Sequence, residues 1–242
     1  MEAIKTKALT KKFKEKTAVD NLELTVHEGE LYALLGVNGA GKSTTIKMLS
    51  CLTQPTSGDA RLMGHSIVSD TSSVKALINV SPQETAVAAK LSVRENLEFI
   101  ARIYGSNKKE ARQKALDMIE KFNMEEIERS KAATLSGGWQ RRLSIAMALI
   151  TEPEILFLDE PTLGLDVLAR RELWHLIERL KGKMTIILTT HYLEEAESLS
   201  DRIGIMSRGV LLAEGTAAEL KAEAGTDVFE EAFIRITEEA VK

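Results

Sequence analysis

The eight residues Gly36-Val37-Asn38-Gly39-Ala40-Gly41-Lys42-Ser43 decide the fold, because they match the pattern G-x-x-x-x-G-K-[ST] in full. The glycines let the backbone wrap around a phosphate group so that its N–H groups point inward. Lys42 places a positive charge on the outer phosphates, and the Ser43 hydroxyl is a suitable ligand for Mg²⁺. A chance match in a turn has odds of about one in a hundred for a chain of ordinary composition. We therefore predict a nucleotide site made by Gly36, Asn38, Gly39, Ala40, Gly41, Lys42, Ser43 and Thr44.

The segments on either side of this loop favour the same interpretation. Residues 31–35 form an apolar run that leads directly into Gly36, and residues 44–52 have helical periodicity. A strand, a glycine-rich loop and a helix are the layout that a phosphate loop requires. Upstream, residues 4–9 and 18–26 are typical of strands, whereas residues 53–59 form a break rich in Pro, Gly and Ser.

The middle of the chain is predicted to be helical. Ser92-x-x-Glu95 is a capping-box pattern ahead of an apolar run with helical spacing. Residues 111–122 form a second predicted helix, and residues 136–150 form a third, which two glycines open. This block interrupts the α/β pattern and is therefore expected to be an inserted helical unit.

After the insertion, strands and helices alternate again. The predicted strands are residues 155–158, 185–189, 203–206 and 210–213, and the predicted helices are residues 170–180, 192–199 and 228–236. Such alternation favours a mostly parallel sheet covered by helices. The predicted fold class is α/β, with a P-loop NTPase core, an antiparallel β subdomain and an inserted α-helical subdomain. We expect one domain over 1–242: a core of 1–83 and 151–242, a helical subdomain over about 84–150, and a C-terminal helix within 226–242.

Composition narrows the classes of function. The chain has 242 residues with a net charge of −4, and a protein that holds nucleic acid by its phosphates usually needs a basic face, so no nucleic-acid partner is expected. Cys51 is the only cysteine, which rules out an intrachain disulfide and fits a reducing compartment such as the cytosol. No apolar run approaches the roughly 18 residues that span a bilayer, and the N-terminus lacks the apolar core of a signal peptide. Any membrane role is therefore expected to come through a partner.

Two acidic residues follow the predicted buried strand at 155–158. Because ligands of open α/β sheets bind at the carboxyl ends of strands, Asp159 is expected near a Mg²⁺ ion bound by Ser43. Glu160 points in a different direction and is a candidate to polarise an attacking water. The alternative is a solvated acidic turn before Pro161.

A second glycine-rich loop, Leu135-Ser136-Gly137-Gly138, lies about ninety residues beyond the first. A loop of this kind ahead of a helix is itself an anion site, because the helix N-terminus offers free N–H groups and a positive dipole end. Two such loops in one small chain suggest that the chain binds a nucleotide with one and offers the other to a nucleotide held elsewhere.

With these motifs in this order, nearly the whole chain resembles an ATP-binding cassette (ABC) protein, the ATPase subunit of a transporter. The resemblance implies that Ser136, Gly137 and Gly138 close on the γ-phosphate of ATP bound to an opposite subunit. It also assigns roles to residues that the pattern alone leaves open. These are Gln83 at Mg²⁺, Asp166 in a loop across the dimer interface, His191 at the γ-phosphate and Phe13 stacked on adenine.

Alternatives remain for several of these residues. Phe13 is also a candidate core residue, and a histidine after a strand, such as His191, is more often structural. The expected catalytic set is Glu160, His191 and Lys42, and the expected metal ligands are Ser43, Gln83 and Asp159.

The resemblance further implies the partners and the activity. It predicts ATP and Mg²⁺ as cofactors, a homodimer or heterodimer with ATP between the subunits, and a separate transmembrane permease. Through this permease the chain is expected to lie peripherally on the cytoplasmic face of the cell membrane. Trp139 stands where the family usually has glutamine, which resembles the branch that exports drugs, lipids and ions. Antibiotic or peptide efflux is the first prediction, and sodium or lipid export the second. A soluble ABC ATPase acting on nucleic acid or the ribosome is a distant third. The sequence leaves the cargo and the identity of the permease open.

Overall fold

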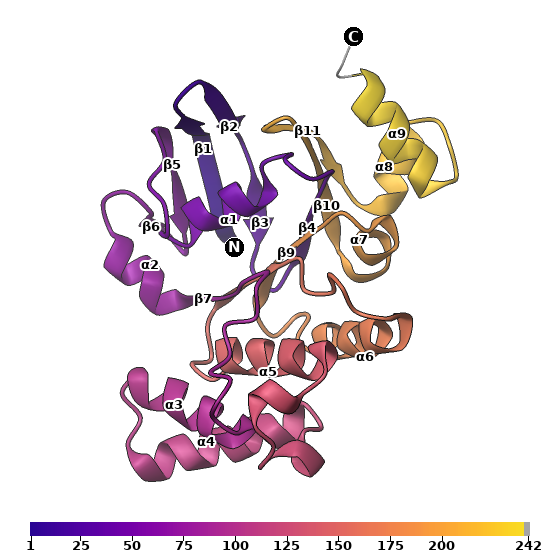
Figure 1. Ribbon diagram of the computed structural model, residues 1–242. Helices are drawn as coiled ribbons and strands as arrows, with labels where there is room; N and C mark the ends of the chain where they lie inside the picture. Colours follow the sequence, from indigo (N-terminus) through magenta and orange to yellow (C-terminus); the bar gives the residue numbers. More distant parts are fainter. Residues whose placement is uncertain (240–242) are drawn as a thin grey trace.

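The computed structural model describes residues 1–239 and contains two β-sheets with helices packed around them (Figure 1). The first sheet is antiparallel, with strand order β2-β1-β5-β6 and β3 paired to β1. Its strands are β1 (Glu2–Phe13), β2 (Lys16–Leu22), β3 (Thr25–His27), β5 (Ser57–Leu62) and β6 (His65–Ser66). Together with the parallel sheet and the helices described next, this arrangement confirms the predicted α/β class.

The second sheet has the order β11-β10-β4-β9-β8-β7 and is parallel except for β11. Its strands are β4 (Leu31–Leu35), β7 (Ile78–Ser81), β8 (Ile155–Asp159), β9 (Thr185–Thr190), β10 (Arg202–Ser207) and β11 (Val210–Gly215). Every residue of β4, β8 and β9 is buried. Continuous apolar runs such as residues 155–158 arise because both faces of a parallel sheet are covered.

Helices cover the parallel sheet and also form the lower part of the molecule in Figure 1. The helices beside the two sheets are α1 (Lys42–Leu49), α2 (Thr71–Leu77), α7 (Leu193–Leu199), α8 (Ala217–Glu223) and α9 (Phe229–Glu239). Below the sheet lie α3 (Val93–Ile103), α4 (Lys108–Lys121), α5 (Gly137–Leu149), α6 (Val167–Glu178) and two short 3-10 helices, Glu125–Ile127 and Ala132–Thr134.

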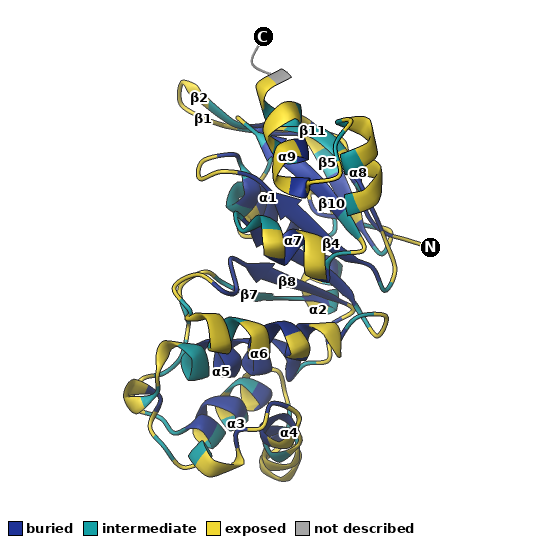
Figure 2. Ribbon diagram, turned by 90° about the vertical axis from the view of Figure 1, so that its right-hand side faces the viewer, coloured by how far each residue is buried: buried dark blue, intermediate teal, exposed yellow. Residues whose placement is uncertain are grey.

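The side chains of the parallel strands point alternately to the two faces of the sheet, and this divides the interior into two main cores. In β8, Leu156 and Leu158 face the helices α3–α6, whereas Ile155 and Phe157 face α1 and the antiparallel sheet. Successive side chains of a strand point to opposite faces, so one strand joins both cores. Figure 2 shows the buried strands and the inward faces of the helices, with exposed residues on the outer helix faces. The sheet edge that carries the loops is therefore held rigidly from both sides.

The helical part begins at the predicted capping box. The Ser92 hydroxyl accepts from the Glu95 N–H at 3.2 Å, and the Glu95 carboxylate accepts from the Ser92 N–H at 2.8 Å. One turn later, the buried Asn96 side chain accepts from the Ala88 N–H at 2.7 Å and donates to the Ser92 carbonyl at 2.9 Å. These bonds fix the segment that follows Gln83.

Several predicted boundaries are wrong. The predicted strand at 18–26 is two strands, β2 and β3, which are interrupted at Glu23 and Leu24 and pair with different parts of β1. The predicted break at 53–59 ends early, since β5 begins at Ser57. The elements α2, β6, β7 and α8 were not predicted, and each has seven residues or fewer. The predicted subdomain boundaries stay predictions, and the last three residues of the predicted C-terminal segment lie outside the described residues.

Candidate active site

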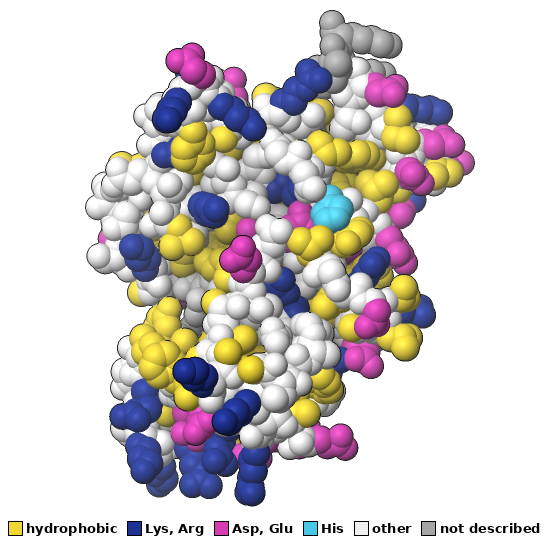
Figure 3. All heavy atoms as spheres, in the orientation of Figure 1, with side chains coloured by type: hydrophobic (Ala, Val, Ile, Leu, Met, Phe, Trp, Pro, Cys, Tyr) yellow, Lys and Arg dark blue, Asp and Glu magenta, His cyan; other side chains and the backbone are white. Residues whose placement is uncertain are grey.

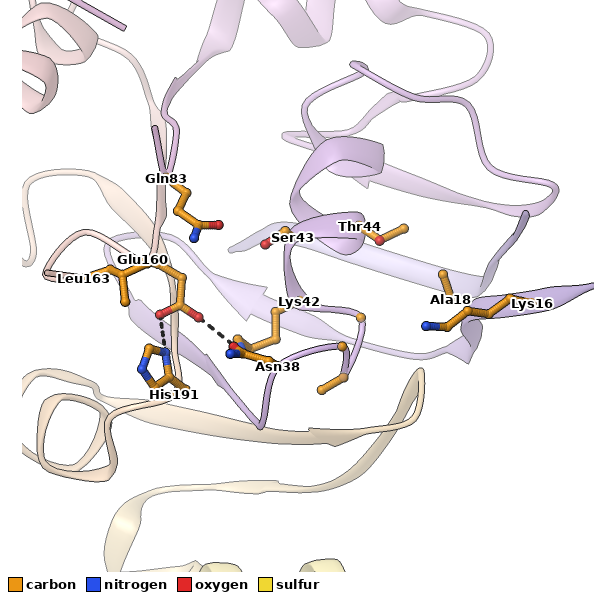
Figure 4. A pocket seen from close by; sticks show the side chains of 13 residues that line it. Lys16, Ala18, Asn38, Lys42, Ser43, Thr44, Gln83, Glu160, Leu163 and His191 are labelled. Carbon is orange, nitrogen blue, oxygen red and sulfur yellow. Dashed lines mark hydrogen bonds and ion pairs between the residues drawn. The ribbon is translucent and has the colours of Figure 1, made fainter. Parts of the chain in front are cut away.

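Four neighbouring parallel strands, β4, β9, β8 and β7, bring the predicted residues to one edge of the sheet. The phosphate loop follows β4, Glu160 follows β8, His191 follows β9, and Gln83 lies two residues after β7. They surround a cavity of about 420 Å³ (Figure 4). Its lining residues are Lys16, Ala18, Asn38, Gly39, Ala40, Gly41, Lys42, Ser43, Thr44, Gln83, Glu160, Leu163 and His191.

Two glycines of the phosphate loop, Gly36 and Gly41, are required by close contacts. A Cβ on Gly36 would lie 2.3 Å from the Met206 carbonyl oxygen, and one on Gly41 would lie 2.6 Å from the Ala18 carbonyl oxygen. Gly41 also has a φ of +110°, which favours glycine. No side chain of the described residues caps the first turn of α1, so its N–H groups are available to bind an anion.

Lys42 is only 5% exposed, although it is a lysine. Its Nζ donates to the Gly36 carbonyl at 2.6 Å and lies 3.3 Å from Glu160 Oε1. A buried ammonium group needs such partners, because burial without them is very unfavourable. A phosphate group in the cavity would compete with Glu160 for this charge.

Glu160 is equally buried, and its carboxylate lies between two other predicted catalytic residues. Oε1 faces Lys42, and Oε2 lies 2.7 Å from His191 Nδ1 (Figure 4). Its backbone is strained, with a φ of +48°, and its N–H donates to the Thr189 carbonyl at 3.1 Å. Strain of this kind persists where the surroundings fix it, and it is concentrated at functional sites. The solvated-turn alternative for the acidic pair is therefore wrong.

The predicted metal ligands supply oxygen atoms in one place. The Ser43 hydroxyl donates to Asp159 Oδ1 at 2.9 Å, and Gln83 lines the same cavity. Hydroxyl, carboxylate and amide oxygens are the ligands that Mg²⁺ prefers, and it commonly takes one or two carboxylates together with phosphate oxygens. These residues therefore fit a magnesium nucleotide. In residues 1–239 no cluster of three or more His, Cys, Asp or Glu could hold a metal by itself.

Of the cavity lining, Lys16, Ala18 and Leu163 were not predicted, and neither were two supporting residues behind it, Thr189 and Arg141. The Thr189 hydroxyl donates to Asp159 Oδ1 at 2.6 Å and accepts from the Glu160 N–H at 3.0 Å, so it fixes both acids. The buried Arg141 of α5 donates to the Pro82 carbonyl at 2.6 Å and to the Gln83 carbonyl. Burial lowers the pKa of this guanidinium from its usual value. Arg141 therefore ties α5 to the loop that carries Gln83.

The second glycine-rich loop lies away from this cavity. Ser136, Gly137, Gly138 and Asp166 are absent from its lining. Ser136 occupies the N-cap position of α5 but makes no capping bond, which leaves its exposed hydroxyl available. Asp166 caps α6 by accepting from the Ala169 N–H at 2.9 Å.

The neighbours of the loop hold it in shape. The Gln140 side chain donates to the Ala132 and Leu135 carbonyls, both at 3.2 Å. Trp139 packs against the core of the helical part, with the Arg142 guanidinium 4.5 Å from its ring centre. The loop backbone is thus intact without a glutamine at the fifth position.

Phe13 is not a core residue, because 49% of it is exposed. It pairs across the β1–β2 hairpin with Lys16, which lines the cavity. Phe13 itself does not line the cavity, and its ring centre lies 5.0 Å from Lys11 Nζ. Its role at adenine stays a prediction.

The model of the family described as ABC transporter matches residues 19–163 of the chain. The chain belongs to this family. It is 42% identical over 226 residues to the daunorubicin resistance ATP-binding protein DrrA3 of Streptomyces coeruleorubidus, covering 93% of this chain and 72% of that protein. A solved structure of an ATP-binding subunit of an ABC transporter is 28% identical and covers 97% of this chain and 99% of its own, with a TM-score of 0.85.

A second solved structure bears on the reaction. It is the dimeric post-hydrolysis state of the ATP-binding cassette MJ0796 bound to ADP and Pi, with a TM-score of 0.79 and 28% identity over 88% of this chain and 98% of that one. The chain is therefore an ATP-binding, ATP-hydrolysing subunit of an ABC transporter. None of the helices described here has the length and apolar character needed to cross a membrane.

A buried carboxyl group beside the site gives a pH-dependent prediction. Glu195 of α7 is fully buried, and burial raises its pKa. The folded chain thus binds this proton more tightly than the unfolded chain does, and stability falls as pH rises from the usual glutamate value of about 4.3 through the raised pKa. The Glu195→Gln variant lacks this loss. Thermal unfolding from pH 5 to 8 should show that the free energy of unfolding of the variant rises relative to that of the parent chain. The expected rise is about 1.4 kcal/mol for each unit by which folding raises the pKa of Glu195. A difference that stays constant with pH would contradict the prediction.

Proposed function

We propose that the chain powers the export of an antibiotic or peptide through a separate membrane subunit. The observation that carries the proposal is its 42% identity to a daunorubicin resistance ATP-binding protein over 93% of the chain. Trp139 in the second glycine-rich loop, where the family usually has glutamine, supports the same direction of transport through its resemblance to the exporter branch.

The geometry of the cavity supports specific roles in hydrolysis. Lys42 and the loop N–H groups hold the outer phosphates of ATP, where the helix dipole also favours negative charge. Ser43, Asp159 and Gln83 would hold Mg²⁺, which supplies charge stabilisation on the phosphate oxygens when bound. Glu160 orients the attacking water and takes its proton as the water oxygen bonds to the γ-phosphorus and the bond to ADP breaks. His191, 2.7 Å from Glu160, donates to the γ-phosphate.

The position of the second loop supports a dimer. Ser136, Gly137 and Gly138 lie outside their own chain's cavity and present an uncapped helix N-terminus. In a head-to-tail dimer they would meet the γ-phosphate held by the partner, and Asp166 would lie at the interface. Each ATP would then be bound by two subunits.

The helical part offers a surface for the membrane subunit. Phe99, Ile103 and Tyr104 of α3 are each about half exposed or more, at 51%, 60% and 57%. Beside them, a small hollow of about 130 Å³ is lined by Pro82, Tyr104 and other residues, next to Gln83. Lys and Arg side chains gather at the lower end of the face in Figure 3, over α3 and α4. An exposed apolar patch rimmed by charge is typical of a protein interface.

Efflux in cells tests the proposal. The chain would be expressed with the membrane protein that co-purifies with it, in a drug-sensitive host, and daunorubicin accumulation measured by fluorescence. We expect lower accumulation with the parent chain, and none of this effect with Lys42→Ala, which loses the phosphate contact. Lys47→Ala is the matched control, because Lys47 is an exposed lysine of the same helix outside the cavity. Unchanged accumulation of daunorubicin and a peptide-antibiotic panel, with ATPase activity intact, would overturn the proposed cargo.

A further inference from the structure

The helix α6 contacts both neighbouring functional segments of the same chain. On one side it packs against α5, the helix that follows the second glycine-rich loop. A Cβ on Gly138 would lie 3.2 Å from the Ala169 Cβ, and Arg142 of α5 donates to the Glu172 carboxylate. Ala169 and Glu172 are three residues apart, so they lie on one face of the helix.

A different face of α6 holds the segment that contains His191. The Arg170 guanidinium lies 4.6 Å from the centre of the Tyr192 ring, whose centre is 4.2 Å from that of His191. One turn further along α6, Trp174 Nε1 donates to Glu195 Oε1 at 2.9 Å. Two contacts from one helix thus fix the residues on the C-terminal side of His191.

The burial and chemistry of these contacts make them specific. Trp174 and Glu195 are both buried, so the indole N–H depends on the Glu195 carboxylate for its polar partner. The Arg170 Nε atom is buried without a hydrogen-bond partner among the described residues, and the guanidinium lies against the Tyr192 ring. A planar guanidinium stacks on an aromatic face, whereas the ammonium group of lysine does not.

We propose that Arg170 and Trp174 are positioning residues of the ATPase reaction, which hold Tyr192 and Glu195 so that His191 stays against Glu160. Because α6 also packs on α5, it links the second glycine-rich loop to the catalytic residues of its own chain. In the head-to-tail dimer this would connect the two ATP sites. The inference rests on the roles proposed above for Glu160 and His191.

The proposal predicts which kinetic constant changes. None of Arg170, Trp174 and Glu195 lines the nucleotide cavity, so ATP binding does not depend on them. Arg170→Lys, which retains the charge but loses the stacking, should lower kcat by about tenfold, because small displacements of reacting groups are costly. The KM for MgATP should stay within about twofold of the parent value, because the contacts that bind ATP before the reaction are unaffected.

The experiment measures MgATP hydrolysis by the purified full chain and its variants, with thermal unfolding as a check of folding. Arg171→Lys is the matched control, since Arg171 is the exposed neighbour on the same helix, and it should behave as the parent chain. Tyr192→Phe keeps the stacked ring and Glu195→Gln keeps an acceptor for the Trp174 indole, so both should retain more activity than Tyr192→Ala and Glu195→Leu.

A combination with His191→Ala separates this inference from the function on which it rests. If Arg170 acts through His191, adding Arg170→Lys to His191→Ala lowers kcat no further. An independent loss in the double variant, or an unchanged kcat in a folded Arg170→Lys, would overturn the positioning role. If His191→Ala itself hydrolyses MgATP at the parent rate, the role proposed for His191 is what fails.

Discussion

The Glu160→Gln variant is expected to hydrolyse ATP at least about 100-fold more slowly than the parent chain, because general-base catalysis contributes roughly 10²–10⁴-fold. Glutamine keeps the shape of the side chain but cannot take a proton from water. The carboxylate also lies 3.3 Å from Lys42 Nζ and would repel the γ-phosphate. Removing its charge frees Lys42 for phosphate, so ATP binding should be equal or tighter, and ATP should promote dimers.

The measurements are phosphate release, equilibrium ATP binding, and size-exclusion chromatography with and without MgATP. Glu194→Gln is the matched control, because Glu194 is an exposed glutamate of α7 outside the cavity. We expect it to match the parent chain in all three assays. Hydrolysis by Glu160→Gln at the parent rate would remove Glu160 from the mechanism, whereas loss of ATP binding would show that the residue is needed to form the site.

The nucleotide site could be predicted from the sequence because its chemistry is local. Gly36 to Ser43 form one continuous loop, and Asp159 and Glu160 follow a buried strand whose apolar run is easy to recognise. Since parallel strands end at one edge of the sheet, the pattern also predicts that these segments meet. The structure bears this out for Ser43 and Asp159, which share a hydrogen bond across 116 positions of sequence.

The supporting contacts could not be predicted, because they depend on how helices pack. Arg141 and Arg142 are adjacent in a charged run, and only the structure shows that one holds the Gln83 loop while the other bonds Glu172. A glutamate such as Glu195 is usually exposed, and nothing local in its sequence marks it as buried under Trp174. Tertiary context decides such positions. Short elements were missed for a related reason, since the four residues of β7 are a strand only because β8 pairs with them.

The Ser136→Arg variant is expected to hydrolyse ATP at least about 100-fold more slowly than the parent chain. Removing a hydrogen-bond donor to the charge that develops in a transition state has an effect of about this size. The isolated chain should bind ATP as before. Ser136 is exposed and makes no capping bond in its own chain, so the fold should accept a larger side chain there. It also lies outside its own cavity, so the monomer site is unchanged. Equilibrium binding at dilute concentration and hydrolysis at dimer-forming concentration measure the two effects. A weaker monomer affinity would place the loop at its own chain's nucleotide.

Mixing two defective variants tests the same geometry by gain of activity. Ser136→Arg keeps a complete phosphate loop and Glu160, whereas Glu160→Gln keeps a complete second loop. In a head-to-tail dimer of the two, one site combines the intact half of each chain and the other combines both defects. Equal mixing should therefore restore up to about a quarter of the parent rate, since half the dimers are mixed and each has one complete site of two. If each site were built from a single chain, the mixture would show only the average of the separate rates, although cross-linking would still detect the mixed dimer. A gain above that average requires that Ser136 acts on ATP held by the other subunit.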